Sequence, residues 1–206
     1  MAMDTRDDRA LDLTAALPVS ADELEARRHR LARAADRHGL LEVTYRTIDS
    51  PLGSLLLAAT ERGLVRVAYE REEFERVLET IAQRVSSRIV RTPARLETAA
   101  RELDEFFSGG RTSFDLALDH SLSSGFRAEV QRALPTIAYG HTASYSDIAT
   151  RVGRPRAVRA VGTACATNPL PIVVPCHRVV RSDGSYGGYV GGVDAKTTLL
   201  TMEGAA

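Results

Sequence analysis

Three short runs of alternating apolar and polar residues constrain the fold of this chain more than any other feature. They cover residues 41–47, 54–59 and 64–69, and turn signals at 49–53 and 61–63 separate them. Runs of this kind predict short strands that bury one face, and connections this short favour antiparallel neighbours. The central expectation is therefore an antiparallel meander near the start of a folded region.

Amphipathic helices follow the meander, and a further strand is predicted at residues 88–91. Apolar residues recur at helical spacing in two segments, at Phe74, Leu78, Ile81 and Val85, and at Leu96, Ala100, Leu103 and Phe107. Residues 40–121 are therefore predicted to form a small N-terminal α/β domain with an antiparallel sheet.

The rest of the chain is expected to be mostly helical. The predicted helices cover residues 125–134, 145–152, 155–166 and 193–202, and a glycine-rich loop at 184–192 precedes the last one. Residues 122–206 then form a second, helical domain. Residues 1–39 are interpreted as a charged helical extension, in which Ser20 and Glu23 match a capping box and the apolar stripe of Leu24 and Leu31 is thin.

Composition narrows the class of protein. Of the 206 residues, 44% are hydrophobic, which is ample for a core, but no apolar run is long enough to predict a membrane span. The chain has only two cysteines, Cys165 and Cys176, and their spacing matches no zinc motif. We therefore expect a protein of the reducing cytoplasm with no metal and no cofactor.

The net charge is zero, but its distribution is uneven. From residue 141 onward there are 7 basic and 4 acidic residues, against 20 and 23 before it. The charge pattern therefore predicts that any surface facing phosphates lies in the C-terminal third.

Residues 145–152 and 155–166 have the layout of a helix-turn-helix, with a capping-type start signal at 144–147 and with Pro155 suited to a first helical position. On the second helix, Val158, Val161 and Cys165 are expected to face the core. The neighbouring face is predicted to carry the small residues Ala157, Ala160, Gly162 and Ala164, with Arg156 and Arg159 beside it. A helix with so few polar side chains reads base edges poorly but can approach a minor groove closely. The same face could instead pack against another helix.

Cys176 is the strongest chemical candidate. Pro175 on one side and His177 on the other favour an electropositive, restricted setting of the kind that lowers a thiol pKa. In an extended segment neighbouring side chains point to opposite faces, so His177 is expected to reach the thiol through a bridging water. The alternative is a buried, inert thiol beside a structural histidine.

Four other residues are ambiguous when they are taken singly. Asn168 before Pro169 is typical of a turn, and Tyr145 at a helix start is typical of packing. Arg159 and Glu203 would usually be solvated charges.

Read together, these pieces resemble the O6-alkylguanine-DNA alkyltransferase family. The matching residues are 140–145, 148–149, 159–162, 168–180, 183–192, 196–200 and Glu203, and the run Pro175-Cys176-His177-Arg178 with its Asn168-Pro169 lead is the most specific part. The resemblance is strong over 122–203, looser over 40–121 and absent from 1–39.

The resemblance implies a function in DNA repair, with stoichiometric, irreversible transfer of the alkyl group of O6-alkylguanine, and of O4-alkylthymine, to the Cys176 thiolate. It implies that His177, held by Glu203, takes the thiol proton through water, and that Asn168 braces the segment. Tyr145 would help to expel the nucleotide and give a proton to the leaving base.

For the partner, the resemblance implies double-stranded DNA bound by a monomer, with cooperative loading left open. Arg159 would fill the gap left by the flipped base, while Ala157, Ala160, Gly162 and Arg156 would contact the duplex from the minor-groove side. Val174, Tyr189 and Val190 would line the substrate pocket. Val190 departs from the family, which often has a hydroxyl residue there, so any contact from this position to the guanine oxygen must come from the backbone.

Three alternative functions stay open at this point. A branch of the same family senses alkylated DNA without repairing it, although it lacks the cysteine that this chain keeps at Cys176. A transcription regulator would use the helix-turn-helix, but it would need polar residues where Ala157–Ala164 stand. A cysteine hydrolase would need an oxyanion hole and repeated turnover.

Overall fold

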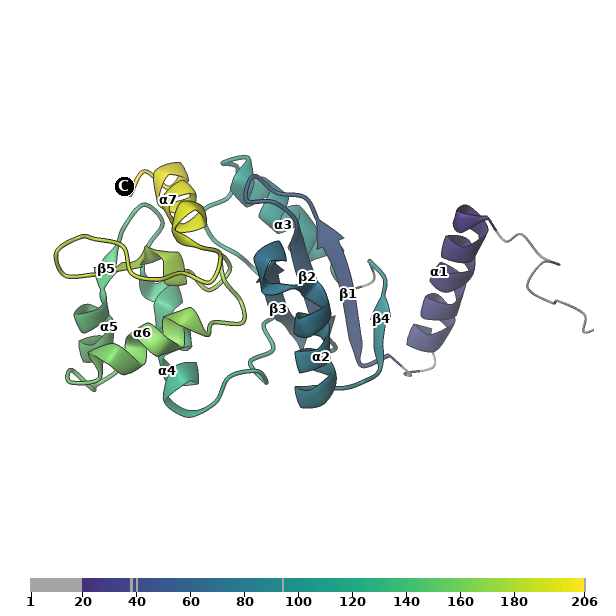
Figure 1. The fold of residues 1–206 in the computed structure, drawn as a ribbon, viewed down its shortest axis with the longest axis horizontal. Coiled ribbons are helices and arrows are strands. Elements are labelled where there is room, and N and C mark those ends of the chain that lie inside the picture. Colours follow the sequence, from purple (N-terminus) through teal and green to yellow (C-terminus); the bar gives the residue numbers. More distant parts are fainter. Residues whose placement is uncertain (1–19, 38, 40, 94, 206) are drawn as a thin grey trace, which may run out of the picture.

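The computed structural model describes residues 20–37, 39, 41–93 and 95–205. The first element is helix α1 (Ala21–Arg37), which lies beyond the sheet at one end of Figure 1. Its capping box is confirmed, because the backbone N–H of Glu23 donates to Ser20 Oγ and that of Ser20 donates to Glu23 Oε2. Leu24 and Leu31 are both exposed. The predicted charged segment before Ser20 lies outside the described residues.

A four-stranded sheet forms the N-terminal part. Its strands are β1 (Val43–Ile48), β2 (Leu55–Thr60), β3 (Gly63–Tyr69) and β4 (Ile89–Arg91), in the order β3-β2-β1-β4. The predicted antiparallel meander β1-β2-β3 is confirmed. The sheet as a whole is mixed, because β4 pairs with β1 in parallel. Helix α2 (Phe74–Arg84), which follows the short turn η1 (Glu70–Glu72), supplies the crossover that a parallel pair requires.

Helices cover both faces of this sheet, so β2 is buried along its whole length. Leu56 and Ala58 point toward α2, whereas Leu55 and Leu57 point to the face where α3 (Glu97–Phe107) packs. The prediction that residues 54–59 alternate and bury one face is therefore wrong, because Leu55–Ala59 is a continuous apolar run, as expected of a strand that is covered on both faces.

The C-terminal part is mostly helical, as predicted (Figure 1). Its elements are α4 (Gly125–Ala133), η2 (Leu134–Thr136), β5 (Ala143–Ser144), α5 (Tyr145–Arg151), α6 (Val158–Ala166), η3 (Cys176–Arg178), β6 (Val179–Val180) and α7 (Val193–Met202). The prediction that Pro155 begins a helix is wrong, since α6 starts three residues later and Pro155 belongs to the preceding turn. None of the described helices combines the length and apolar character needed to cross a membrane.

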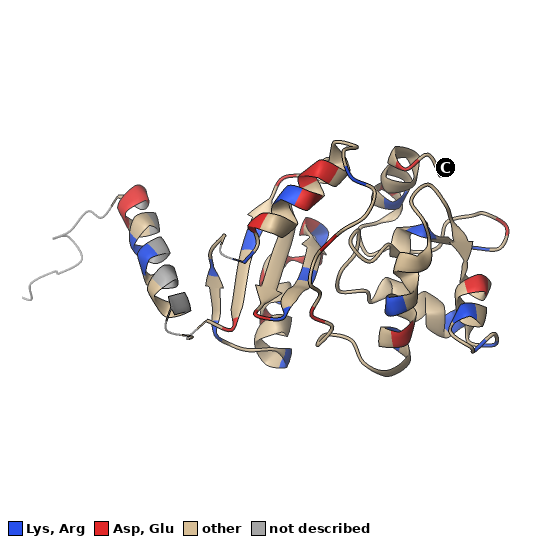
Figure 2. Ribbon diagram, turned by 180° about the vertical axis from the view of Figure 1, so that it is seen from behind, with Lys and Arg blue, Asp and Glu red and all other residues tan. Residues whose placement is uncertain are grey.

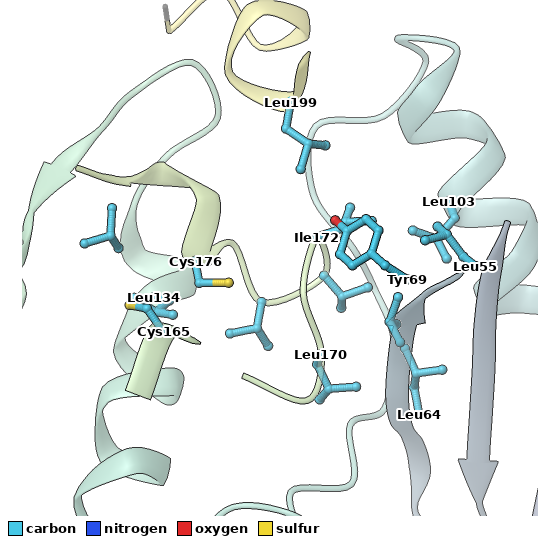
Figure 3. Close-up of a cluster of buried hydrophobic side chains, with 14 of the residues drawn as sticks. Leu55, Leu64, Tyr69, Leu103, Leu134, Cys165, Leu170, Ile172, Cys176 and Leu199 are labelled. Atoms are coloured by element: carbon cyan, nitrogen blue, oxygen red, sulfur yellow. The ribbon is translucent and has the colours of Figure 1, made fainter. Parts of the chain in front are cut away.

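One hydrophobic cluster joins the two parts. Figure 3 shows it extending from Leu55 and Leu103, past Ile172 and Leu199, to Cys176. A backbone hydrogen bond of 2.9 Å from Val67 N–H to the carbonyl of Pro169 crosses the same boundary. The boundaries predicted at residues 39 and 121 stay predictions, but residues from both sides of 121 share one core.

Leu57 is fully buried in that cluster, and its truncation tests the importance of the shared core. We expect Leu57→Ala to lower the free energy of unfolding by about 2–5 kcal/mol, because it removes buried methyl groups and leaves a cavity. Urea denaturation followed by circular dichroism measures the change. Leu31→Ala, at a residue that is 71% exposed, should stay within about 0.5 kcal/mol of the unaltered chain.

Candidate active site

The cysteine segment is a short turn of 3-10 helix. Pro175 precedes η3, and the N–H of Cys176 donates to the carbonyl of Val174 at 2.8 Å. The predicted extended conformation is therefore wrong for Cys176 and His177, although both side chains are buried. Only 2% of Cys176 is exposed, so a bulky substrate must bring its reactive group into the protein.

Asn168 braces this turn. Its Nδ2 donates to the carbonyl of Val174 at 2.8 Å and to Sγ of Cys176 at 3.1 Å, while its Oδ1 accepts from the N–H of Leu170 at 3.1 Å. Asn168 is itself fully buried, so its amide is used for bonding and not only for turn formation. A donor aimed at the sulfur stabilises negative charge there.

The prediction of a lowered thiol pKa for Cys176 is wrong. Burial raises the pKa of Cys176 to about 11, although the hydrogen bond from Asn168 and the charge of Lys196 both act in the opposite direction. The sequence pattern gave the right neighbours but could not show that desolvation outweighs them. At pH 7 roughly one thiol in ten thousand is then ionised, so the site needs a base if Cys176 is to act as a nucleophile.

His177 is placed to be that base. Its Nε2 lies 2.9 Å from Oε1 of Glu203, and a carboxylate can only accept, so Nε2 carries the hydrogen. Nδ1 is then an acceptor, and it is a buried atom with no hydrogen-bond partner among the described residues. Burial lowers the pKa of His177, which keeps the ring neutral and able to take a proton.

Arg178 is a site residue that the sequence interpretation missed. Its Nε donates to Oε2 of Glu203 at 2.8 Å and its Nη2 donates to Oε1 at 2.9 Å, while Nη1 donates to the carbonyl of Ile137. Burial alone would raise the pKa of Glu203, but the hydrogen bonds from His177 and Arg178 hold it at about 2. Glu203 is thus a buried, ionised and paired carboxylate, not a solvated one.

Lys196, the only lysine in the chain, was also missed as a neighbour of the site. It is fully buried, donates from Nζ to the carbonyl of Val179 and lies over the ring of Tyr186. Burial lowers its pKa, and its charge favours the thiolate form of Cys176.

Tyr145 begins α5 at a confirmed capping box, in which the N–H of Asp147 donates to Ser144 Oγ. Its ring approaches Gly162 on α6, and its hydroxyl lies where a side chain on Gly187 would have to be. Burial raises the pKa of Tyr145, and so does the negative charge that Cys176 would carry as a thiolate. The loop and both helices therefore bring this phenol near the sulfur.

Two of the predicted pocket residues, Val174 and Tyr189, contact the cysteine turn, and the N-terminal part supports one of them. Tyr189 packs edge-on to His177, with 6.3 Å between ring centroids, and its hydroxyl lies 2.8 Å from that of Tyr69 on β3. Val174 is buried and Val190 half-buried. Tyr69 was not predicted, since no local signal connects a strand residue with a loop 120 positions away.

Helix α6 presents an exposed surface beside this site. Arg156, Arg159 and Ala160 are exposed, and Ala157 and Gly162 are half-buried. The prediction that Val158 faces the core is wrong, because this residue is exposed where the helix begins. Ala164 is buried, and Gln131 on α4 donates to its carbonyl, which agrees with the alternative that part of the small-residue face packs against another helix. Within the described residues, no group of three or more His, Cys, Asp or Glu side chains could hold a metal ion.

Two family models match the chain. They are the ribonuclease-like domain of 6-O-methylguanine DNA methyltransferase over residues 43–120 and the DNA binding domain of the same family over 125–205. A curated protein of Mycolicibacterium paratuberculosis named methylated-DNA--protein-cysteine methyltransferase is 41% identical over 161 residues, which cover 78% of this chain and 92% of that protein. The inducible protein of that name from Bacillus subtilis is 40% identical over 71% of this chain and 82% of its own length.

The fold matches solved structures as well. The Mycobacterium tuberculosis OGT in complex with DNA is 38% identical, with a TM-score of 0.67, covering 79% of this chain and 93% of that one. The O6-methylguanine methyltransferase of the same organism gives a TM-score of 0.66 at 38% identity and the same coverage.

The buried Glu203 carboxylate makes a prediction about acid stability. Because its pKa is about 2 in the folded chain against an ordinary 4.5, its stabilising contribution is complete above pH 4.5 and is lost as the pH falls toward 2. We expect the unfolding free energy of Glu203→Gln to fall less steeply between pH 5 and pH 3 than that of the unaltered chain. The difference in slope should correspond to at most one proton taken up on unfolding. Denaturant titrations at several pH values measure this slope. An unchanged slope would contradict the assignment of Glu203 as a buried, ionised carboxylate. The matched control is Glu79→Gln, at an exposed residue of α2.

Proposed function

Because the chain belongs to the 6-O-methylguanine DNA methyltransferase family and repairs DNA by alkyl transfer, we propose that Cys176 is the residue that accepts the alkyl group. The observation that carries this assignment is the contact of Asn168 Nδ2 with Cys176 Sγ at 3.1 Å, beside the buried His177–Glu203 pair. Cys165, the other thiol, receives no such hydrogen bond from any described residue, and burial raises its pKa strongly.

The transfer begins with removal of the thiol proton. Nδ1 of His177 takes it through a bridging water, which also provides the hydrogen-bond partner that this buried atom otherwise lacks. Glu203 holds the ring and offsets the positive charge that His177 gains. Asn168 and Lys196 stabilise the thiolate while it exists.

The sulfur then attacks the alkyl carbon in line. The S–C bond forms as the C–O6 bond breaks, and the electron pair of the broken bond goes to guanine, which receives a proton from Tyr145. A thioether is a poor leaving group, so each molecule reacts once. Val174, Tyr189 and Val190 line the pocket, and the reaction extends to O4-alkylthymine.

The substrate is O6-alkylguanine in a DNA duplex, bound by one copy of the chain. Cys176 is too deeply buried to meet a stacked base, which supports extrusion of the nucleotide. The exposed small-residue surface of α6, with Ala157, Ala160 and Gly162, approaches the minor groove. Arg159 fills the gap in the stack and Arg156 contacts phosphate. Two free thiols support a reducing cytoplasm as the setting, and cooperative loading on DNA stays a hypothesis.

Mass spectrometry tests the acceptor assignment. After incubation with a duplex that contains O6-methylguanine, we expect the intact chain to gain one methyl group, located on the peptide that contains Cys176. Cys176→Ser should gain none, whereas Cys165→Ser should gain one.

The methyl group on any other peptide would contradict the assignment. An unmodified chain that still binds the lesion tightly would favour the alternative, a sensor of alkylated DNA.

The relay through His177 predicts a distinctive pH dependence. We expect His177→Ala to slow single-turnover transfer at pH 7 by about 10²–10⁴-fold, because the base is lost. The deficit should shrink as the pH rises toward 11, where the thiol ionises unaided. Rapid-quench rates between pH 7 and pH 10 measure this. A deficit that stays constant with pH would rule out the relay, and His141→Ala, at an exposed histidine, is the control.

A further inference from the structure

A groove of about 490 Å³ lies between the N-terminal and C-terminal parts, and its lining reaches Asn168 and Val190 at the edge of the site described above. Helix α2, the end of β3 and the residues that follow α6 form its walls. Its charged lining consists of Arg66, Arg71, Arg76, Arg84, Arg127 and a single carboxylate, Glu72. A surface with five guanidinium groups and one carboxylate carries a strong positive potential.

Internal pairing neutralises little of this charge. Arg66 pairs with Glu72 and also reaches the carbonyl of Asn168. Arg76 contacts Glu73 at 3.4 Å, but both side chains are mostly exposed, so the pair is weak. Within the described part of the chain, Arg84 donates only to the carbonyl of Leu122.

Arg71 and Arg127 form no ion pair with any residue that the structure describes. Arg71 instead lies against the backbone of Gly192 in the glycine-rich loop. Guanidinium groups held together without counter-charges bind anions, and phosphate matches their geometry best.

The position of the groove indicates which phosphates it meets. Its lining includes Ala166 and Thr167, at the end of α6, and α6 and α2 lie on the same side of the molecule in Figure 1. Helix α6 has 9 residues, so about 13 Å separate its start near Arg159 from the groove. That length corresponds to about four base pairs of duplex.

We propose that this arginine-lined groove binds the phosphate backbone of the DNA that flanks the lesion, about four base pairs from the flipped nucleotide. The inference rests on the proposed role of α6, and it extends the DNA-binding surface from the C-terminal part onto α2. The uneven distribution of charge along the sequence predicted phosphate contacts in the C-terminal third alone. That count misses the groove because its arginines come from β3, the turn after it, α2 and α4, in stretches where neighbouring acidic residues lower the net charge along the sequence.

The test compares the removal of two charges from the groove with the removal of two charges elsewhere on the molecule. The groove variant is Arg76→Gln with Arg127→Gln. The control is Arg101→Gln with Arg132→Gln, which changes the charge equally on α3 and on another part of α4. Helix α3 packs on the opposite face of the sheet from α2, and the ribbon of Figure 2 shows both basic and acidic positions along it.

Affinity for an undamaged duplex of about 20 base pairs is measured as a function of salt concentration. Each phosphate contact adds about 0.9 to the slope of log affinity against log salt. We expect the slope of the groove variant to be shallower by close to two contacts, with the control near the unaltered chain. The proposal would be overturned by an unchanged slope in the groove variant, or by a control whose slope becomes shallower by the same amount. An unchanged slope in the groove variant would point to an acidic protein segment as the occupant of the groove.

Duplex length gives a second, independent result. A lesion-containing duplex that ends two base pairs from the lesion cannot reach the groove, so the groove variant and the control should bind it equally. Equal losses by the groove variant on short and long duplexes would place these arginines at the lesion itself and overturn the proposal. Thermal denaturation confirms that both variants fold. Methylation of Cys176 is followed by mass spectrometry in the same samples. Failure of the groove proposal would appear as an unchanged salt dependence of DNA affinity, whereas failure of the acceptor assignment would appear as the absence of a methyl group on Cys176.

Discussion

The site depends on one buried carboxylate. Glu203 follows the last helix, yet it accepts hydrogen bonds from His177 and Arg178 in the middle of the C-terminal part. Removing a carboxylate from water is costly, and only charged or hydrogen-bonding partners on both oxygens offset that cost. The same contacts fix the tautomer of His177 and aim Nδ1 away from Glu203. Three features therefore depend on one another: the position of the chain after α7, the orientation of the His177 ring and the position of the cysteine turn.

Burial creates the chemical problem that this network solves. A thiol that is 2% exposed is shielded from most electrophiles, and desolvation raises its pKa to about 11, so it is unreactive at rest. Asn168 and Lys196 lower the cost of the thiolate but do not outweigh burial. Under the proposed mechanism this arrangement suits a single-use protein, because the sulfur would become a nucleophile only when a base, a bridging water and a substrate are all present.

The N-terminal part contributes to the proposed chemistry, although the catalytic residues proposed above all lie in the C-terminal part. It shares one hydrophobic cluster with the C-terminal part, and Tyr69 on β3 holds the hydroxyl of Tyr189 beside the pocket. A side chain on Gly191 would clash with the Tyr69 ring, so the loop can pack there only as glycine. The sheet is thus a rigid support for one wall of the pocket and one wall of the arginine-lined groove.

Local patterns in the sequence determined the meander at 43–69, the bounds of α7, the capping boxes of α1 and α5, and the identity of the cysteine segment. Each of these depends on residues within a few positions of one another. Tertiary structure decided the rest: the parallel placement of β4, the roles of Arg178 and Tyr69, and the raised pKa of Cys176. These features depend on burial and on contacts between segments far apart in the chain. Desolvation is a property of the packed molecule, so no run of letters could reveal which effect on the thiol is larger.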